Sequence, residues 1–180
     1  MVSTNTEVAF FAGGCFWCTE AVFQRVNGVL DVVPGYIGGE IKNPAYREIC
    51  TGRTGHAEAV KITYDPTLVD FRELLTAFFA THDPTTLNKQ GNDVGTQYRS
   101  EIFYTNLQQK QTTDDFIVML GSEYVFDNAI VTAVSEASEF YVAGEDHHDF
   151  YNQHRNQPYC QIIIDPKLKK LASISNLKLN

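Results

Sequence analysis

The chain has 180 residues, of which 43% are hydrophobic and 12% aromatic, so it is long and apolar enough to bury a sizeable core. Its 22 acidic and 14 basic residues give a formal net charge of -8, which argues against nucleic acid or an anionic membrane surface as a partner. No apolar run approaches the roughly twenty residues that a membrane-spanning helix requires, and the first residues lack the pattern of a secretory signal.

These features predict a cytoplasmic protein that acts as a monomer. No internal repeat and no linker-like stretch divides the sequence, so residues 1–180 are expected to form a single domain. Its core is expected over about 7–166, followed by a C-terminal tail over 167–180.

Taken in chain order, the apolar periodicity predicts strands and helices that neither alternate strictly nor segregate, which is typical of an α+β fold. Strands or extended segments are expected over 7–12, 29–39, 56–65, 100–105, 129–134 and 161–165. Helices are expected over 15–26, 70–82, 106–120 and 145–154, and from Pro166 onward as a surface helix. Gly28 is placed to end the first helix, and Asp70 is placed to cap the second.

Three long, polar, glycine-rich loops connect these elements, over residues 35–56, 82–100 and 136–148. Long irregular loops inside a compact domain are commonly functional. We expect the active site to be built from them.

Cys15 follows Gly13 and Gly14 at the point where the first strand gives way to the first helix. A thiol attacks only as the thiolate, and the unpaired N–H groups and dipole at a helix N-terminus stabilise an anion. The position therefore favours a nucleophilic Cys15 with a lowered pKa. The alternative is a small buried hydrophobic residue.

Cys18 lies one helical turn after Cys15, close enough for a disulfide if the turn loosens. This spacing permits a cycle in which Cys15 is oxidised to a sulfenic acid and Cys18 condenses with it. The alternative is that Cys18 only faces the core beside Val22. Cys50 and Cys160 each lack a nearby Cys or His, which disfavours a metal site.

Phe16 and Trp17 separate the two cysteines, and Trp17 is the one tryptophan of the chain. Bulky rings beside a nucleophile indicate a small apolar pocket, which suits a methyl or thioether group. Core packing is the competing interpretation for Phe16.

Several motifs then occur in an order typical of one family: "GCFWCTEAVF", "GYIGG", "NPAYREIC", "TGHAEAV", "HDPTTLNKQGNDVGTQYRS" and "NQPYCQ". From about Glu7 to about Pro166 the chain resembles type A peptide methionine sulfoxide reductases. The resemblance implies a two-layer α/β sandwich with a mixed, largely antiparallel sheet and a ferredoxin-like core, with the catalytic Cys at the N-terminus of the first helix.

The implied reaction is reduction of methionine (S)-sulfoxide, free or in proteins, to methionine. The implied reductant is thioredoxin or a small dithiol, and no cofactor or metal is expected. By motif, Cys15 resembles the nucleophile, and Phe16 and Trp17 resemble the walls that hold the substrate methyl. Further residues match the family's acid, its two hydroxyl donors to the sulfoxide oxygen and an acid that orders them: Glu58, Tyr46, Tyr98 and Asp93.

The chemistry of S–O cleavage agrees with this assignment of Glu58. Sulfoxide oxygen leaves poorly unless it is protonated, so the acid must stay protonated near neutral pH, which for a glutamate requires burial. An isolated strand glutamate would otherwise be expected to face solvent. Tyr46 and Tyr98 in isolation are likewise more often packing residues, although two phenols and a carboxylic acid together suit oxygen binding.

The chain departs from the family pattern at a few positions. Many relatives have glycine at the position of Cys18 and recycle through a cysteine near the C-terminus, so both Cys18, which we prefer, and Cys160 are candidate resolving thiols. Cys50 is expected to be structural. Gly144 stands where relatives usually carry an acid. His147 matches a family histidine expected to support the site through hydrogen bonds, with capping or surface exposure as the alternative.

Two other classes of protein fit part of the pattern. A thioredoxin-like disulfide oxidoreductase also places C-x-x-C at a helix start, but it needs neither the aromatic spacer nor the three loops. A redox-sensing module without turnover would use the same pocket for a methionine-like ligand.

Overall fold

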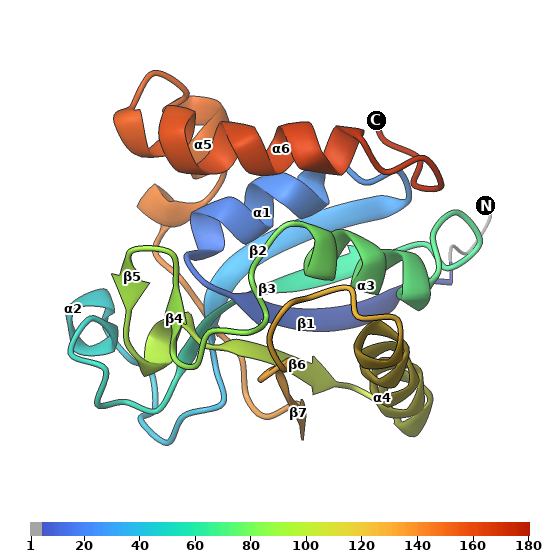
Figure 1. Cartoon of the computed structure of the whole chain (residues 1–180). Helices are drawn as coiled ribbons and strands as arrows, with labels where there is room; N and C mark the ends of the chain where they lie inside the picture. Colours follow the sequence, from blue (N-terminus) through green and yellow to red (C-terminus); the bar gives the residue numbers. More distant parts are fainter. Residues whose placement is uncertain (1–4) are drawn as a thin grey trace.

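The computed structural model describes residues 5–180, which form a mixed α/β structure around one large sheet (Figure 1). The sheet has six strands in the order β7-β6-β1-β3-β2-β8, and all neighbours are antiparallel except β6 and β7. The strands are β1 (Glu7–Gly13), β2 (Val29–Ile37), β3 (Ala57–Tyr64), β6 (Ser100–Tyr104), β7 (Ala133–Glu136) and β8 (Tyr141–Val142). A separate hairpin pairs β4 (Lys89–Gln90) with β5 (Asp93–Val94).

Helices cover one face of this sheet, and one of them forms an outer layer. The helices are α1 (Phe16–Gln24), α2 (Tyr46–Ile49), α3 (Phe71–Ala80), α4 (Leu107–Ser122), α5 (Phe150–Gln153) and α6 (Asp165–Ala172). Helix α6 lies over α1, on the side away from the sheet (Figure 1). None of the helices within residues 5–180 is long and apolar enough to cross a membrane.

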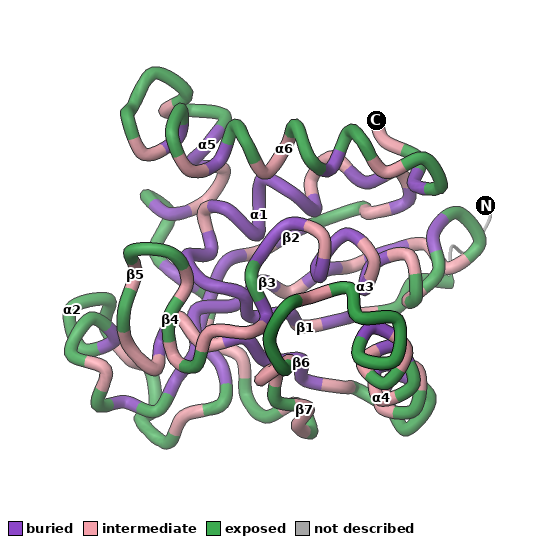
Figure 2. The backbone as a smooth tube through the Cα atoms, viewed as in Figure 1, coloured by how far each residue is buried: buried purple, intermediate pink, exposed green. Residues whose placement is uncertain are grey.

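The alternation of β1 divides the core between the two faces of the sheet. Phe11 points toward the helices, where its ring stacks on Phe23, Phe71 and Phe78 at centroid distances of 5.3, 5.8 and 5.0 Å. Ala12 points to the other face, into a smaller cluster with Ile37, Ala57, Ala59 and Phe103. The buried backbone accordingly runs through α1 and the central strands (Figure 2). The sheet is therefore covered on both faces where the site begins.

Most of the predicted elements form, with shorter ends. The strands predicted over 7–12, 56–65 and 100–105 correspond to β1, β3 and β6, and the segment 29–39 corresponds to β2. Asp70 caps α3 as predicted, because its side chain accepts a hydrogen bond from the Glu73 N–H at 2.7 Å. The prediction that Gly28 ends the first helix was wrong, because α1 ends at Gln24 with Arg25 as its C-cap, and Gly28, with φ of 97°, lies directly before β2.

The prediction of a strand over 161–165 was wrong. Cys160–Ile164 forms a π-helix (η3) that continues directly into α6. The apolar run of this segment does not by itself distinguish strand from helix. Here Cys160 and Ile164 are buried four residues apart while Ile162 is exposed, which is a helical pattern.

The predictions over 129–134 and 145–154 were correct only in part. The strand near the first segment is β7, which begins at Ala133. The second segment forms a 3₁₀ turn, η2 (Glu145–His147), and then α5, because Asp149 between them adopts a left-handed φ of 56°. Helix α2, the β4–β5 hairpin and β8 were not predicted from sequence.

Candidate active site

The first strand ends at a tight turn that delivers Cys15 to the start of α1. Gly14 has φ of 94°, and a Cβ atom on Gly13 would lie 2.7 Å from Phe78 Cε1. Both positions therefore require glycine. Cys15 is the N-cap residue of α1. Cys15 thus lies at the N-terminus of the first helix, as predicted from the sequence.

The thiols of Cys15 and Cys18 lie together in the interior. The two residues are 9% and 4% exposed, and both belong to a buried cluster that also contains Cys160. A cavity of about 230 Å³ is lined by both of them, together with Asp93 from β5. Cys50, in contrast, is exposed at the end of α2. Within residues 5–180 there is no group of three or more His, Cys, Asp or Glu side chains that could hold a metal ion.

The predicted lowering of the Cys15 pKa is not found in this resting geometry. Burial raises the pKa of the Cys15 thiol well above its usual value, and its hydrogen bond with Cys18 and the neighbouring Glu58 act in the same direction. The Trp17 N–H at the helix start opposes this but is weaker. The pKa of Cys18 is lowered, above all because the Cys15 thiol donates a hydrogen bond to it. At Cys15, burial raises the pKa more than the N-terminus of the helix lowers it.

Glu58 is the second residue of β3 and is only 2% exposed. Its Oε1 accepts a hydrogen bond at 3.2 Å from the N–H of Phe16, the residue after Cys15. Burial nevertheless raises the pKa of this carboxyl to about 8, against the opposing effect of that hydrogen bond. The side chain is therefore mostly protonated at neutral pH, as the chemistry of an acid for sulfoxide oxygen requires.

Phe16 and Trp17 contact both the hydrophobic core and His147. Phe16 is 1% exposed and belongs to the main core cluster, so the packing interpretation holds for it. Its ring centroid also lies 5.2 Å from that of His147. The Trp17 ring stacks on Phe150 at 3.7 Å, and its Nε1–H donates to His147 Nδ1 at 3.1 Å. Trp17 is therefore held in one orientation.

His147 is buried rather than on the surface. It is 6% exposed, and burial lowers its pKa, so the ring is neutral and accepts from Trp17. The ring centroid of Tyr46, in the loop over 35–56 that carries α2, lies 4.5 Å from that of His147. The histidine thus connects two predicted site residues.

Tyr46 and Tyr98 approach the site from two different loops, Tyr46 at the start of α2 and Tyr98 at the end of the 3₁₀ turn η1 (Thr96–Tyr98). Burial is the main cause that raises the pKa of each phenol, and Glu58 and Cys15 both contribute in each case. Their hydroxyl groups therefore share one electrostatic environment with the buried acid and the thiol.

Asp93 has a partner that the sequence did not predict. Its Oδ2 accepts a hydrogen bond from the Tyr159 hydroxyl at 3.0 Å, and that hydroxyl lies 3.5 Å from Cys18 Sγ. Asp93 is thereby connected to the second thiol. Tyr159 lies in the "NQPYCQ" motif, from which the sequence prediction took only Cys160.

Tyr36 is a second residue that sequence reasoning missed. It is 2% exposed, and its hydroxyl has no hydrogen-bond partner among the described residues. It pairs with Glu58 across β2 and β3, and after burial Glu58 is the largest cause that raises its pKa. Its place in "GYIGG" was the available signal, since a strand residue opposite Glu58 shares its face of the sheet.

Comparison with known proteins settles the family. The model of the peptide methionine sulfoxide reductase family matches residues 7–178. The chain belongs to this family. It is therefore an oxidoreductase, and the resemblance drawn from the motifs is confirmed.

Individual members of the family match over most of the chain. "Peptide methionine sulfoxide reductase MsrA" of Sulfolobus acidocaldarius is 54% identical over 164 residues, which cover 91% of this chain and 92% of that protein. The protein of the same name from Deinococcus radiodurans is 54% identical over 173 residues, covering 96% and 84%. The solved structure of methionine sulfoxide reductase A of Corynebacterium diphtheriae matches with a TM-score of 0.73 and 34% identity, over 83% of this chain and 76% of that one.

Proposed function

We propose that this family member reduces the S epimer of methionine sulfoxide, free or in proteins, with Cys15 as the nucleophile. One observation carries the proposal: Glu58, buried and with a pKa of about 8, binds the amide N–H of the residue that follows Cys15. An acid that is protonated at neutral pH is thereby fixed next to a thiol at a helix start. That pair is what sulfoxide reduction by a thiol needs.

The first step joins Cys15 to the sulfoxide sulfur. The thiol sulfur attacks and forms an S–S bond, Glu58 donates its proton to the oxygen, and the thiol proton replaces the one that Glu58 gave up. The S–O bond of the substrate then breaks, its hydroxyl group passes to Cys15 Sγ, and the S–S bond to the substrate breaks. The products are methionine and a sulfenic acid on Cys15, so the substrate gains the two electrons that the cysteine loses. The Tyr46 and Tyr98 hydroxyls donate to the oxygen as its charge develops. Asp93 orders this set of hydrogen bonds.

Phe16 and Trp17 hold the methyl group of the substrate. The support is their position as the first two residues of α1, directly after Cys15, and the contacts of Trp17 with His147 and Phe150. Contacts between aromatic rings and sulfur or methyl groups are favourable by up to about 1.5 kcal/mol. His147 positions Trp17 and does not exchange protons with the substrate.

The sulfenic acid is then resolved by Cys18 or Cys160 as a disulfide. Both lie in the same buried cluster as Cys15. A dithiol partner reduces that disulfide by thiol–disulfide exchange. We propose thioredoxin as this partner, and a small dithiol replaces it in the assay. No prosthetic group is needed for this cycle.

The finer description of the fold is also a proposal. We infer a ferredoxin-like core, supported by the order β6-β1-β3-β2 with α1 between β1 and β2 and α3 between β3 and β6. A single catalytic domain over 1–180 is supported by the burial of Leu171 and Leu177 in the main core cluster, although both lie beyond residue 166. The cytoplasm is the proposed compartment, because this cycle depends on cysteines that are kept reduced.

Stoichiometry distinguishes this function from the two rival classes. Reduced protein is mixed with excess methionine (S)-sulfoxide without reductant, and methionine formed and thiols lost are both counted. The proposal requires one methionine for two thiols lost, no methionine from Cys15→Ser, and full yield from the control Cys50→Ser. Repeated turnover with dithiothreitol excludes a sensor that reacts once. Disulfide exchange without methionine formation would instead support the disulfide oxidoreductase.

A further inference from the structure

The chain around the predicted strand 161–165 presents a row of side chains to the cavity of about 230 Å³ that Cys15 and Cys18 line, the thiol cavity. Tyr159, Ile163 and Lys167 all line this cavity, at intervals of four residues. The π-helix η3 and the first turn of α6 produce this row. Segments of π-helix occur frequently at functional sites. The row faces Cys18 as well as Cys15, so its polar members are placed to act on the second thiol.

Tyr159 contacts Cys18 directly. Its hydroxyl lies 3.5 Å from Cys18 Sγ and 3.0 Å from Asp93 Oδ2. The hydroxyl has one proton, which it donates to Asp93 while Cys18 is a thiol. When Cys18 loses its proton, the same hydroxyl is in reach to donate to the sulfur instead. The Tyr159 ring packs edge-on against Trp17 at 5.7 Å, which fixes its direction.

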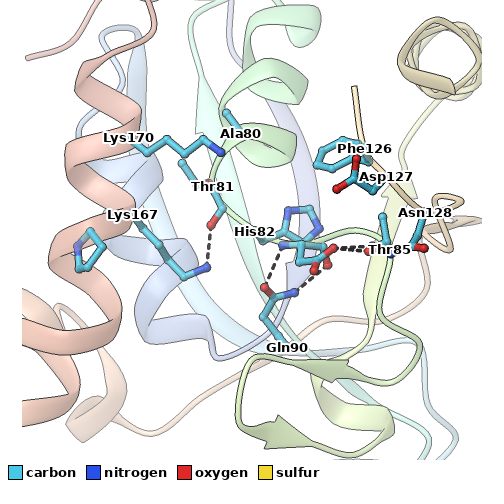
Figure 3. A pocket seen from close by; sticks show the side chains of 12 residues that line it. Ala80, Thr81, His82, Thr85, Gln90, Phe126, Asp127, Asn128, Lys167 and Lys170 are labelled. Atoms are coloured by element: carbon cyan, nitrogen blue, oxygen red, sulfur yellow. Dashed lines mark hydrogen bonds between the residues drawn. The ribbon is translucent and has the colours of Figure 1, made fainter. Parts of the chain in front are cut away.

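Lys167 approaches the thiols from α6. Its Nζ donates to the Thr81 carbonyl at 2.6 Å, which leaves further ammonium hydrogens free of that bond (Figure 3). Lys167 also lines a neighbouring cavity of about 490 Å³, which shares Gln90 with the thiol cavity. The side chain is half-buried, so its charge acts on the buried sulfur atoms with little screening by salt.

The charges around Cys18 leave Lys167 as the cation that favours the thiolate. The titratable groups that face Cys18 are Cys15 from α1, Glu58 from β3, His82 after α3, Asp93 from β5, and Tyr159, Cys160 and Lys167 from the C-terminal segment. Burial lowers the pKa of His82 to about 4, so this ring is neutral. Burial also keeps Glu58 mostly protonated. Asp93 opposes the effect of the ammonium group on Cys18, and Tyr159 donates a hydrogen bond to this carboxylate. Asp83 also acts on Lys167 and favours its charged form.

We propose that Lys167 and Tyr159 activate Cys18 and so make it the resolving thiol of this chain. The proposal rests on the proposed function, because it requires a sulfenic acid on Cys15. The Cys18 thiolate attacks the sulfur of that sulfenic acid, the S–S bond forms and the S–O bond breaks. The departing hydroxide takes up the proton that the Cys18 thiol released and leaves as water. No external oxidant or reductant enters this step.

Cys160 lacks this activation although it is close by. It is fully buried, and burial raises the pKa of its thiol, with the neighbouring Cys18 acting in the same direction. Cys160 also does not line the cavity that Cys15 and Cys18 share. The same segment therefore places a lysine and a tyrosine at Cys18, while its own cysteine lies outside that cavity.

The test separates resolution from methionine formation in single-turnover experiments. Reduced protein is mixed with one equivalent of N-acetyl methionine (S)-sulfoxide between pH 6 and 9 and quenched with acid. Methionine release and the Cys15–Cys18 disulfide are measured by mass spectrometry. The variants are Lys167→Met, Lys167→Arg and Tyr159→Phe, and the control is Lys169→Met, an exposed lysine on the same helix that lines neither cavity.

For Lys167→Met, we expect the ratio of the disulfide rate to the methionine-release rate to fall about tenfold, with the pH midpoint of disulfide formation raised by about one unit. Lys167→Arg restores most of the ratio, and Tyr159→Phe lowers it severalfold even if Lys167→Met does not fold. A ratio and a pH midpoint equal to those of Lys169→Met in both Lys167→Met and Tyr159→Phe would overturn the proposal. Absence of methionine release from the wild type would instead overturn the proposed function.

Discussion

Replacement of Glu58 by glutamine gives the sharpest test of the acid. Glutamine keeps an oxygen that can accept the Phe16 N–H bond, now 3.2 Å long, so the start of α1 is preserved while the titratable proton is lost. Loss of a general acid typically slows a reaction by about 10²- to 10⁴-fold, or about 3–5 kcal/mol of transition-state stabilisation. We expect a decrease of that size at pH 7, where a carboxyl of pKa about 8 is mostly protonated.

The pH dependence distinguishes the acid from a structural role. The wild-type rate of methionine formation should rise with pH and then level off above pH 8, because the loss of the Glu58 proton cancels the gain in Cys15 thiolate, whose pKa lies higher. In Glu58→Gln this levelling disappears, and the remaining slow rate keeps rising above pH 8 with ionisation of Cys15. The assay is single-turnover methionine formation from the S epimer between pH 6 and 10, with the exposed Glu123→Gln as control. The same levelling above pH 8 in Glu58→Gln, or a rate within threefold of the wild type at pH 7, would refute the reasoning.

The remaining predictions concern stability, measured by urea unfolding. Burial raises the pKa of Glu20 from 4.5 to about 7, so the folded state binds more protons than the unfolded state above pH 4.5 and loses stability as the pH rises toward 7. Glu20→Gln should therefore stabilise the protein at pH 8 by up to about 2 kcal/mol and have little effect at pH 4; an equal effect at both values would contradict this. Tyr36→Phe removes a buried hydroxyl that has no hydrogen-bond partner within residues 5–180 and should stabilise by about 1 kcal/mol, whereas a loss of that size would show that the hydroxyl is satisfied. Phe11→Ala should destabilise by about 3–5 kcal/mol, because the ring is fully buried between three others, and a loss below about 1 kcal/mol would show that the core collapses around it.

Local signals in the sequence predicted the elements that depend on local chemistry. Helix α3 has a capping aspartate, an amphipathic pattern and a start at Phe71, and it forms as predicted. Cys15 stands at the N-terminus of α1 because Gly14 supplies the positive φ that the turn needs. These features need no information from distant parts of the chain.

Tertiary packing decided the features that the sequence did not reveal. The Cys15 pKa was predicted from the helix terminus, but burial beside Cys18 and Glu58 reverses its direction. The 161–165 segment was predicted as a strand from its isoleucines, but contact with α1 and the thiols selects a helix. Lys167 was assigned to a surface tail and in fact lines the thiol cavity. Each case depends on residues far apart in the sequence, which periodicity and motif spacing do not report.

The most direct test of the account is to trap the oxidised nucleophile. The double variant Cys18→Ser/Cys160→Ser leaves Cys15 and the exposed Cys50 as thiols. After one turnover with each separated epimer of N-acetyl methionine sulfoxide, the protein is treated with dimedone, which labels sulfenic acids, and mapped by mass spectrometry. The account predicts one dimedone adduct on Cys15 for each methionine formed, with the S epimer only. Methionine formed without an adduct on Cys15, or an adduct on Cys50 in its place, would contradict it.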